Sequence, residues 1–280
     1  MKLAHLILAH ANPDQLNKLI AKLAHEDADF YIHVDNKTAI EPFLFLARQP
    51  RVYFIKKRVK VLWGGYSIVQ ATLNSFEEIL AAGQQYDYIN LLSGQDYPIK
   101  STPFIHRFLK DNPDKIFMQF LSIKEEWQEA IPRFTKYHLG NFDFRGKYTV
   151  ERIINAVLPE RKMPHHITLV GRSQWFTATP KSITYIVQYL KDNPKTVTYF
   201  KRSWAADESM FQTIIYNSEF RKYMVNDNLL FVDWSEKRHS PKILNMEDKQ
   251  QLTDSPKLFA RKFDWKSGEE ILNYLDTITS

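Results

Sequence analysis

The sequence predicts an α/β fold with a mostly parallel central sheet and helices on both of its faces. Short apolar runs alternate with amphipathic stretches through the first half of the chain, which is the pattern of repeated strand–helix–strand units. Polar residues follow two of these runs, at the strand ends where open parallel sheets hold ligands. With 280 residues and 44% hydrophobic side chains, the chain can bury a sizeable core.

The expected strands are apolar runs in the first half and one run near the end. The N-terminal run ends at Ala9, and the next one ends in the acidic residue Asp35. We find no Gly/Ser linker and no internal repeat, so we expect a single domain of two merged halves, over about 1–122 and 123–280. The expected strands are residues 3–9, 29–35, 52–55, 86–92, 116–121 and 229–232.

Proline, glycine and capping residues set the expected helix boundaries. Asn12 before Pro13 predicts an N-cap and a first helical position, Ser67 is expected to cap a long amphipathic helix, and Gly83 to stop it. Beyond residue 125 the pattern becomes irregular and indicates an insertion with one helix. We expect helices at 13–25, 67–82, from 102, 149–157 and 180–192, a loop at 164–166, and an irregular basic tail over 238–263.

Charge and composition narrow the possible partners. The net charge of +6 suits nucleic acid, an anionic membrane face or a phosphorylated substrate. The absence of cysteine excludes disulfides and thiolate metal sites. No stretch is long enough to span a bilayer, and the apolar N-terminus reads as a buried strand rather than a signal peptide. The glycine-rich dinucleotide and P-loop motifs, the HExxH zinc pair and the Gly-x-Ser-x-Gly nucleophile turn are absent.

Two adjacent carboxylates, Asp207 and Glu208, precede apolar residues at helical spacing. Acidic side chains suit the first turn of a helix because the free N–H groups there favour negative charge. A carboxylate held at a helix start can also serve as a general base. The residues alone leave both interpretations open. The Asp-Ala-Asp sequence at 27–29 precedes its strand instead of following it, so we interpret it as a solvated loop and expect no metal site.

Polar residues at two strand ends are candidate ligand groups. Asp35, with Lys37 close behind it, is placed to accept hydrogen bonds from a ribose or a base, or simply to form a turn. The turn from Ser93 to Asp96 contains Gly94, which permits close approach of a ligand. It is equally compatible with an ordinary strand-to-helix connection.

Aromatic and basic residues form two further candidate groups. Trp63 begins a Trp-Gly-Gly loop that offers an aromatic wall. Near the C-terminus, two phenylalanines flank Arg261 and Lys262, which can fix the backbone and direct Lys262 toward a diphosphate. Arg238 and Lys242 add charge nearby. The alternative is that these cations form a solvated face.

Six segments, in this order along the chain, resemble the branching glycosyltransferases of family 14. That family contains the core-2 and I-branching β-1,6-N-acetylglucosaminyltransferases and the peptide O-xylosyltransferases. Each motif is weak alone, but six in order are a specific signal, and the segment 226–234 is more similar to the xylosyltransferase branch. The segments are 31–37 (YIHVDNK), 61–67 (VLWGGYS), 88–99 (YINLLSGQDYPI), 171–176 (GRSQWF), 207–213 (DESMFQT) and 258–263 (LFARKF).

The resemblance implies a GT-A fold, a nucleotide-binding half followed by an acceptor- and diphosphate-binding half, and inverting transfer from a UDP-sugar. It also implies no divalent metal, because basic side chains replace the cation at the diphosphate. Glu208 matches the family's catalytic base, Lys262 matches a diphosphate-binding lysine, and Lys242 or Arg238 matches the second cation. Asp35 matches an acid on the uridine side. The remaining substrate-binding positions implied by the motifs are Lys37, Trp63, Ser93, Asp96, Gln174, Trp175, Asp207 and Arg261.

The chain differs from the Golgi members of that family, which carry a membrane anchor, a stem and disulfides. We therefore expect a bacterial-type cytoplasmic enzyme, peripheral at the inner face of the membrane, that adds GlcNAc or xylose to a glycan or lipid-linked glycan for cell-surface polysaccharide synthesis. The alternatives are a non-catalytic relative that binds sugar nucleotides and a basic nucleic-acid-binding protein. No nucleic-acid recognition motif supports the latter, so we expect no nucleic-acid partner.

Overall fold

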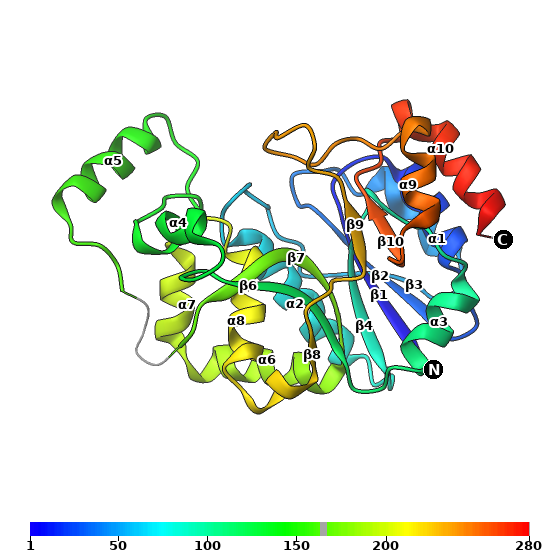
Figure 1. Ribbon diagram of the computed structural model, residues 1–280, viewed down its shortest axis with the longest axis horizontal. Coiled ribbons are helices and arrows are strands. Elements are labelled where there is room, and N and C mark those ends of the chain that lie inside the picture. Colours follow the sequence, from blue (N-terminus) through cyan, green and yellow to red (C-terminus); the bar gives the residue numbers. More distant parts are fainter. Residues whose placement is uncertain (163–166, 280) are drawn as a thin grey trace. The chain divides into compact units, whose positions relative to one another are not determined.

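A computed structural model describes residues 1–162 and 167–279 as two compact units (Figure 1). Unit 1 contains the described parts of Met1–Ile55, Gln85–Asp114 and Leu229–Ser280, and unit 2 those of Lys56–Gln84 and Lys115–Asn228. Neither unit is a continuous stretch of sequence. The count of one domain stays a prediction, and the loop expected at 164–166 lies outside the described residues.

Four parallel strands form the sheet of unit 1, in the order β3-β2-β1-β4. They are β1 (Leu3–Ala9), β2 (Ala28–Val34), β3 (Val52–Phe54) and β4 (Tyr88–Ser93). Leu3 lies opposite both Ala28 and Tyr88, so β1, β2 and β4 are parallel and in register. Their carboxyl ends therefore lie at the same edge of the sheet. All three are buried along their whole length, which explains why the sequence shows them as continuous apolar runs.

The irregular tail expected over 238–263 is wrong from residue 246 onward, where helical elements and a strand of unit 1 form, whereas residues 238–245 form no helix or strand, as expected. Three short strands make a second sheet in the order β5-β10-β9: β5 (Asp96–Pro98), β10 (Phe259–Arg261) and β9 (Leu230–Val232). The helical elements of the unit are α1 (Pro13–Leu23), η1 (Glu41–Arg48), α3 (Thr102–Lys110), η5 (Met246–Asp248), α9 (Lys249–Asp254) and α10 (Trp265–Ile278).

Unit 2 has its own strands and its own aromatic core. β6 (Ile116–Ser122) pairs antiparallel with β7 (Val170–Ala178) and parallel with β8 (Met224–Val225). The rings of Phe76, Phe176 and Phe211 pack 5.6–6.1 Å apart and join α2, β7 and α8. The helices are α2 (Ser67–Ala81), α4 (Ile131–Thr135), α5 (Lys147–Val157), α6 (Pro180–Asp192), α7 (Pro194–Lys201) and α8 (Met210–Tyr216), with turns η2 (Gln128–Ala130), η3 (Ala206–Glu208) and η4 (Glu219–Tyr223).

Several local expectations need correction. Asn12 precedes α1 in a left-handed conformation and its side chain makes no capping bond. The Ser67 hydroxyl accepts a hydrogen bond from the Leu62 amide at 2.7 Å, so it closes the preceding loop instead of capping α2. Asp29 is no solvated loop residue, because it lies buried in β2 and pairs with Arg51 at 3.1 Å. Across the part of the chain that the structure describes, no helix is long and apolar enough to cross a membrane.

Candidate functional site

Asp207 and Glu208 lie in η3, a single 3₁₀ turn that precedes α8, and not in the helix itself. The turn is held on β7 by close backbone packing. A Cβ on Gly171 would lie 2.3 Å from the Glu208 carbonyl oxygen, so only glycine fits there. On the other side, the Ala205 amide donates to the Gly64 carbonyl at 2.9 Å. Two glycines of the family-like motifs therefore position the carboxylate pair.

Glu208 is half-buried and forms an ion pair with Arg133, whose Nη1 lies 2.6 Å from Oε2. Burial raises the pKa of Glu208, while Arg133, and more weakly Arg172, act in the opposite direction. Arg133 thus favours the ionised form of Glu208 against the effect of burial, and about a third of the carboxylate side chain remains exposed. The ionised form is the one that a general base requires.

The two arginines share an aromatic platform that sequence reasoning missed. The guanidinium carbons of Arg133 and Arg172 lie 4.9 and 5.1 Å from the ring centre of Trp127, and Arg172 also faces Glu129 at 3.7 Å. Trp127 is 4% exposed, so it forms a rigid base beneath both cations. Of the two arginines, only Arg172 lies in a motif that the sequence singled out. Arg133 lies 75 residues before Glu208 in the chain, so no local pattern connects the two.

Asp207 has a different environment from its neighbour. Its side chain is buried, and its Oδ1 has no hydrogen-bond partner among the described residues. Burial, and then the charge of Glu208, raise the pKa of Asp207.

On β7, Gln174 likewise keeps a buried Nε2 without a partner in the described chain. The next residue, Trp175, donates its amide to the Ser173 hydroxyl at 3.3 Å.

Trp63 also belongs to unit 2 and stands beside the motif that carries Glu208. Its side chain is 72% exposed and meets the ring of Trp204 edge-on at 4.9 Å. Gly64 allows this approach, because a Cβ there would lie 2.5 Å from the Trp204 ring. An exposed indole supported by a second one provides a stacking surface for a sugar or another flat ligand face.

Unit 1 brings Asp35 and Lys262 into one neighbourhood with a residue that sequence reasoning missed, His10. Asp35 follows β2, accepts from the Lys37 amide at 2.9 Å and lies 3.5 Å from the Lys37 ammonium. Partial burial and the charges of Lys262 and Lys37 lower the pKa of His10, while Asp35 opposes them. The strand-end acid and the C-terminal lysine therefore both act on the pKa of His10, in opposite directions.

The Ser93–Asp96 turn closes on itself and on β10. Asp96 Oδ2 accepts from the Ser93 amide at 2.8 Å, and the Ser93 hydroxyl accepts from the Gln95 amide at 3.1 Å. Asp96 Oδ1 lies 3.5 Å from Arg261 in a buried ion pair across β5 and β10. Burial raises the pKa of Asp96 to about 6 against the opposing effect of Arg261. This pair fixes the turn, and Lys262 follows it directly.

Lys262 is half-buried, and its backbone is fixed as the sequence suggested. Phe259 and Phe263 are buried on either side, and the Lys262 carbonyl accepts from the Leu244 amide at 2.9 Å. Burial and the charge of Arg261 lower the pKa of Lys262. Its ammonium is therefore a partly desolvated cation on a rigid backbone.

The two rival cations differ in their surroundings. Lys242 is 19% exposed, pairs with Asp248 at 2.6 Å, and lies two residues from the Leu244 amide that holds Lys262. The hydrogen bond to Asp248 raises the pKa of Lys242. Arg238 is 74% exposed and faces Glu236 at 3.4 Å. Lys242 is thus the more fixed of the two, and it lies in the segment that bonds to the backbone of Lys262.

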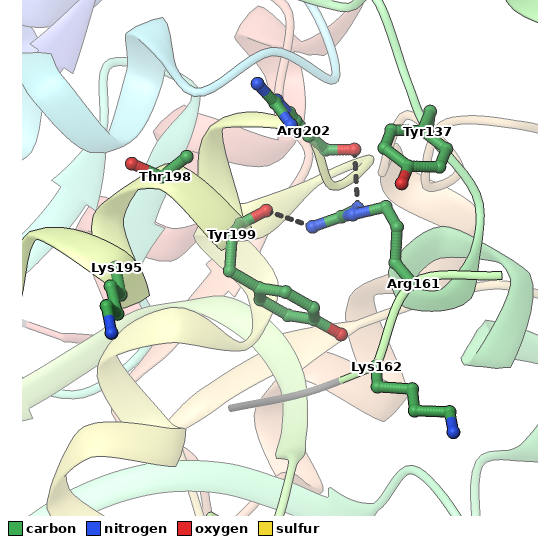
Figure 2. Close-up of a pocket in the computed structure, with 7 residues that line it drawn as sticks. All are labelled: Tyr137, Arg161, Lys162, Lys195, Thr198, Tyr199 and Arg202. Carbon is green, nitrogen blue, oxygen red and sulfur yellow. Dashed lines mark hydrogen bonds between the residues drawn. The ribbon is translucent and has the colours of Figure 1, made fainter. Parts of the chain in front are cut away.

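A cavity of about 300 Å³ opens in unit 2, and none of the residues that line it is among the predicted site residues (Figure 2). Arg161 lies at its wall and is saturated by protein groups, because its guanidinium donates to the carbonyls of Lys136, Tyr199 and Arg202. This cation therefore has a structural role. The cavity is lined by Tyr137, Arg161, Lys162, Lys195, Thr198, Tyr199 and Arg202.

Within residues 1–162 and 167–279, no group of three or more His, Asp and Glu side chains is arranged to hold a metal ion.

A model of the Core-2/I-Branching enzyme family matches residues 3–254. The chain belongs to this family. The motif resemblance seen in the sequence is therefore confirmed over most of the chain.

Relatives within this family include animal xylosyltransferases. The chain is 27% identical over 306 residues to xylosyltransferase 2 of Canis lupus familiaris, covering 99% of this chain and 33% of that protein. It is 25% identical over 299 residues to a xylosyltransferase of Ciona intestinalis, covering 99% and 34%. The chain thus spans about one third of the length of these relatives.

The fold agrees with a solved glycosyltransferase structure. The galactosyltransferase LgtC, crystallised in complex with donor and acceptor sugar analogs, matches with a TM-score of 0.51 over 99% of this chain and 95% of that one. The two sequences are 8% identical, so the likeness concerns the fold alone. This family member therefore has the GT-A type of α/β fold with a mixed, mostly parallel central sheet.

Proposed function

We propose that the chain is an inverting glycosyltransferase that moves GlcNAc or xylose from a UDP-sugar to a hydroxyl of a glycan acceptor. The new bond has β stereochemistry, and no divalent metal takes part. Membership of the Core-2/I-Branching enzyme family and similarity to proteins named xylosyltransferases support the reaction class. The observation that carries the proposal is Glu208, a partly exposed carboxylate that pairs with Arg133 at 2.6 Å, above the ring of Trp127.

In the proposed reaction Glu208 accepts the proton of the acceptor hydroxyl. The oxygen attacks the anomeric carbon from the side opposite the leaving group, the bond to the UDP oxygen breaks, and one displacement inverts the centre. Arg133 favours the ionised form of Glu208, which is the form that accepts the proton. Trp63 offers the stacking surface for the acceptor, and Gln174 and Trp175 are substrate-binding candidates on β7.

The groups of unit 1 are assigned to the donor. Asp35 accepts hydrogen bonds from the uridine, and Lys262 stabilises the negative charge that develops on the departing diphosphate. Lys242 is the proposed second cation, because it is more fixed than Arg238 and close to Lys262 in the fold. Positive side chains at the diphosphate supply the charge that a divalent metal would otherwise provide.

A donor panel and the Glu208→Gln variant test this proposal. Thermal shift against UDP-GlcNAc, UDP-xylose and other nucleotide sugars identifies the donor, and transfer to a glycan array then measures the rate. Removal of a general base typically costs ~10²–10⁴ in rate, so Glu208→Gln should lose transfer but keep UDP binding. Glu125→Gln, an exposed carboxylate of the same unit, is the matched control.

Two outcomes would contradict the proposal. Near-normal transfer by Glu208→Gln removes the assigned base. Activity that depends strictly on Mn²⁺ and is lost in EDTA removes the metal-free scheme, while leaving the assignment of Glu208 intact.

A further inference from the structure

Helix α5 (Lys147–Val157) belongs to unit 2 and is labelled in Figure 1. It has no buried residue, although its sequence is strongly amphipathic. Its apolar side chains follow the i, i+3, i+4, i+7 spacing of one helix face: Val150, Ile153, Ile154 and Val157. Val150 is 40% exposed, Ile153 57% and Val157 76%. We call these four residues the apolar stripe. A surface helix of a globular protein normally turns such a stripe toward the core.

The opposite, polar face of α5 is the one that contacts the protein. Asn155 accepts from the Tyr137 amide and donates to the Tyr137 carbonyl, both at 2.8 Å. Glu151 accepts from the Leu139 amide at 2.8 Å and lies 3.1 Å from the ring of His138. These bonds fix the rotation of the helix about its axis, so Val150, Ile153 and Val157 are held away from the body of the unit, while Ile154 is partly covered.

The segments on both sides of α5 extend the exposed apolar surface. Phe142 and Phe144 precede the helix and are 55% and 45% exposed, and Leu158 follows it at 47%. Apolar side chains gathered at this density on a surface mark an interaction site, since soluble proteins rarely leave them contiguous and uncovered.

Basic residues accompany the apolar stripe and indicate what covers it. Between residues 142 and 162 the exposed charged side chains are three cations, Arg145, Arg152 and Lys162, and two acids, Asp143 and Glu160. Lys162 lies on the wall of the cation-lined cavity (Figure 2). Tyr137, which α5 holds through Asn155, lines the same cavity. The chain carries a net charge of +6, so a second copy on this surface would bring an excess of positive charge face to face, whereas an anionic surface neutralises that excess.

We propose that α5, with the preceding loop and its flanking cations, binds to an anionic lipid membrane. The helix lies in the plane of the interface, the apolar stripe and Phe142 and Phe144 enter the boundary with the acyl chains, and the cations contact the lipid phosphates. This inference does not rest on the proposed transfer reaction, because membrane binding is measured without any substrate.

A fluorescent probe at the apolar stripe tests the insertion directly. The chain has no cysteine, so Val157→Cys can be labelled at one site with an environment-sensitive dye. We expect a blue shift when the full-length labelled protein meets vesicles of phosphatidylcholine with phosphatidylglycerol, and none with phosphatidylcholine alone. The same dye at Leu44→Cys, an exposed apolar position of unit 1, should not respond.

Sedimentation with vesicles measures how much the apolar stripe and the cations contribute to the affinity for the membrane. The double variant Ile153→Ser and Val157→Ser should bind the anionic vesicles about tenfold or more weakly, because burying one large apolar side chain is worth roughly that factor. Arg152→Gln should weaken binding to the anionic vesicles and make that binding depend less on salt. Lys266→Gln, which removes an exposed cation of α10, is the control and should change neither property. Both serines replace exposed side chains, so unchanged thermal unfolding verifies that the fold is kept.

Three results would overturn the proposal. They are equal vesicle binding by the double variant, absence of the blue shift at Val157, and a concentration-dependent dimer in sedimentation velocity that the double variant abolishes. The last would assign the apolar stripe to a second copy of the chain.

Discussion

At the scale of single residues, the structure separates two carboxylates that are adjacent in the sequence. Glu208 is half-exposed and paired with Arg133, whereas Asp207 is buried with an oxygen that has no partner among the described residues. Both pKa values are raised by burial, but only Glu208 has a cation in direct contact that favours its charged form. This difference supports Glu208 as the base and leaves Asp207 a positioning role.

Removing Arg133 should therefore move the pH dependence of transfer. Arg133 lowers the pKa of Glu208, so Arg133→Met should raise it and shift the acidic limb of kcat/KM upward by about one pH unit or more. Arg172 acts more weakly on the same carboxylate, and Arg172→Met should give a smaller shift in the same direction. An unchanged acidic limb in Arg133→Met would mean that another group titrates there.

The two rival cations can be told apart by donor affinity. Lys242→Met should weaken UDP binding about tenfold or more, the value of a charge-assisted hydrogen bond, while Arg238→Met should change it little. Calorimetry measures both, at a temperature where the folded state of each variant has been verified, because Lys242→Met also leaves Asp248 without its ion pair. A larger loss in Arg238→Met would reverse the assignment.

At the scale of elements, a substitution of Gly171 in β7 tests how closely the turn η3 must pack against this strand. An alanine Cβ there would meet backbone atoms of Glu208 and Ser209 at 2.3–2.6 Å, and backbone cannot yield as a flexible side chain can. We expect Gly171→Ala to lower the free energy of unfolding by about 1–3 kcal/mol and to reduce transfer through displacement of Glu208.

Gly268→Ala is the matched control for this change. Its added Cβ would meet ordinary contacts at 3.6–3.7 Å inside α10, so stability should stay equal or rise slightly. Denaturant unfolding of both variants decides the point. Equal stability of Gly171→Ala and the wild type would show that η3 can shift away without cost.

The elements also show what the sequence can and cannot predict. The strands at residues 3–9 and 29–35 and the helix Pro180–Asp192 were predicted because continuous burial and helix-start signals are local features. β10 was missed because its three residues depend on partners about 30 and 160 residues away in β9 and β5. Arg133 was missed for the same reason, since only the fold brings it to Glu208.

At the scale of the whole molecule, buried histidines make stability depend on pH. Burial lowers the pKa of His5 to about 3 and of His106 to about 4. The folded state therefore keeps both rings neutral, and the unfolded state takes up their protons as the pH falls below 6.5. Their contribution is complete above pH 6.5 and is lost between about 6.5 and 3, with each worth on the order of 3–5 kcal/mol.

Urea unfolding across this range measures the effect as a slope. Between pH 6.5 and 4, the slope of the unfolding free energy against pH measures how many more protons the unfolded state binds than the folded state. In His106→Gln this number should fall by up to one proton per molecule. His239→Gln, at an exposed position, should leave the slope unchanged. If the His106→Gln slope equals that of the wild type, His106 is already protonated in the native protein.

The interleaving of the two units sets an order of completion on the ribosome. Unit 2 has all of its residues once Asn228 has been made, whereas unit 1 begins at Met1 and still lacks β9, β10, α9 and α10 at that moment. Asp96 must wait for Arg261 before its charge can be buried against a partner. The carboxylate assigned to the acceptor thus belongs to a unit whose residues are all made before the lysine assigned to the diphosphate has been added.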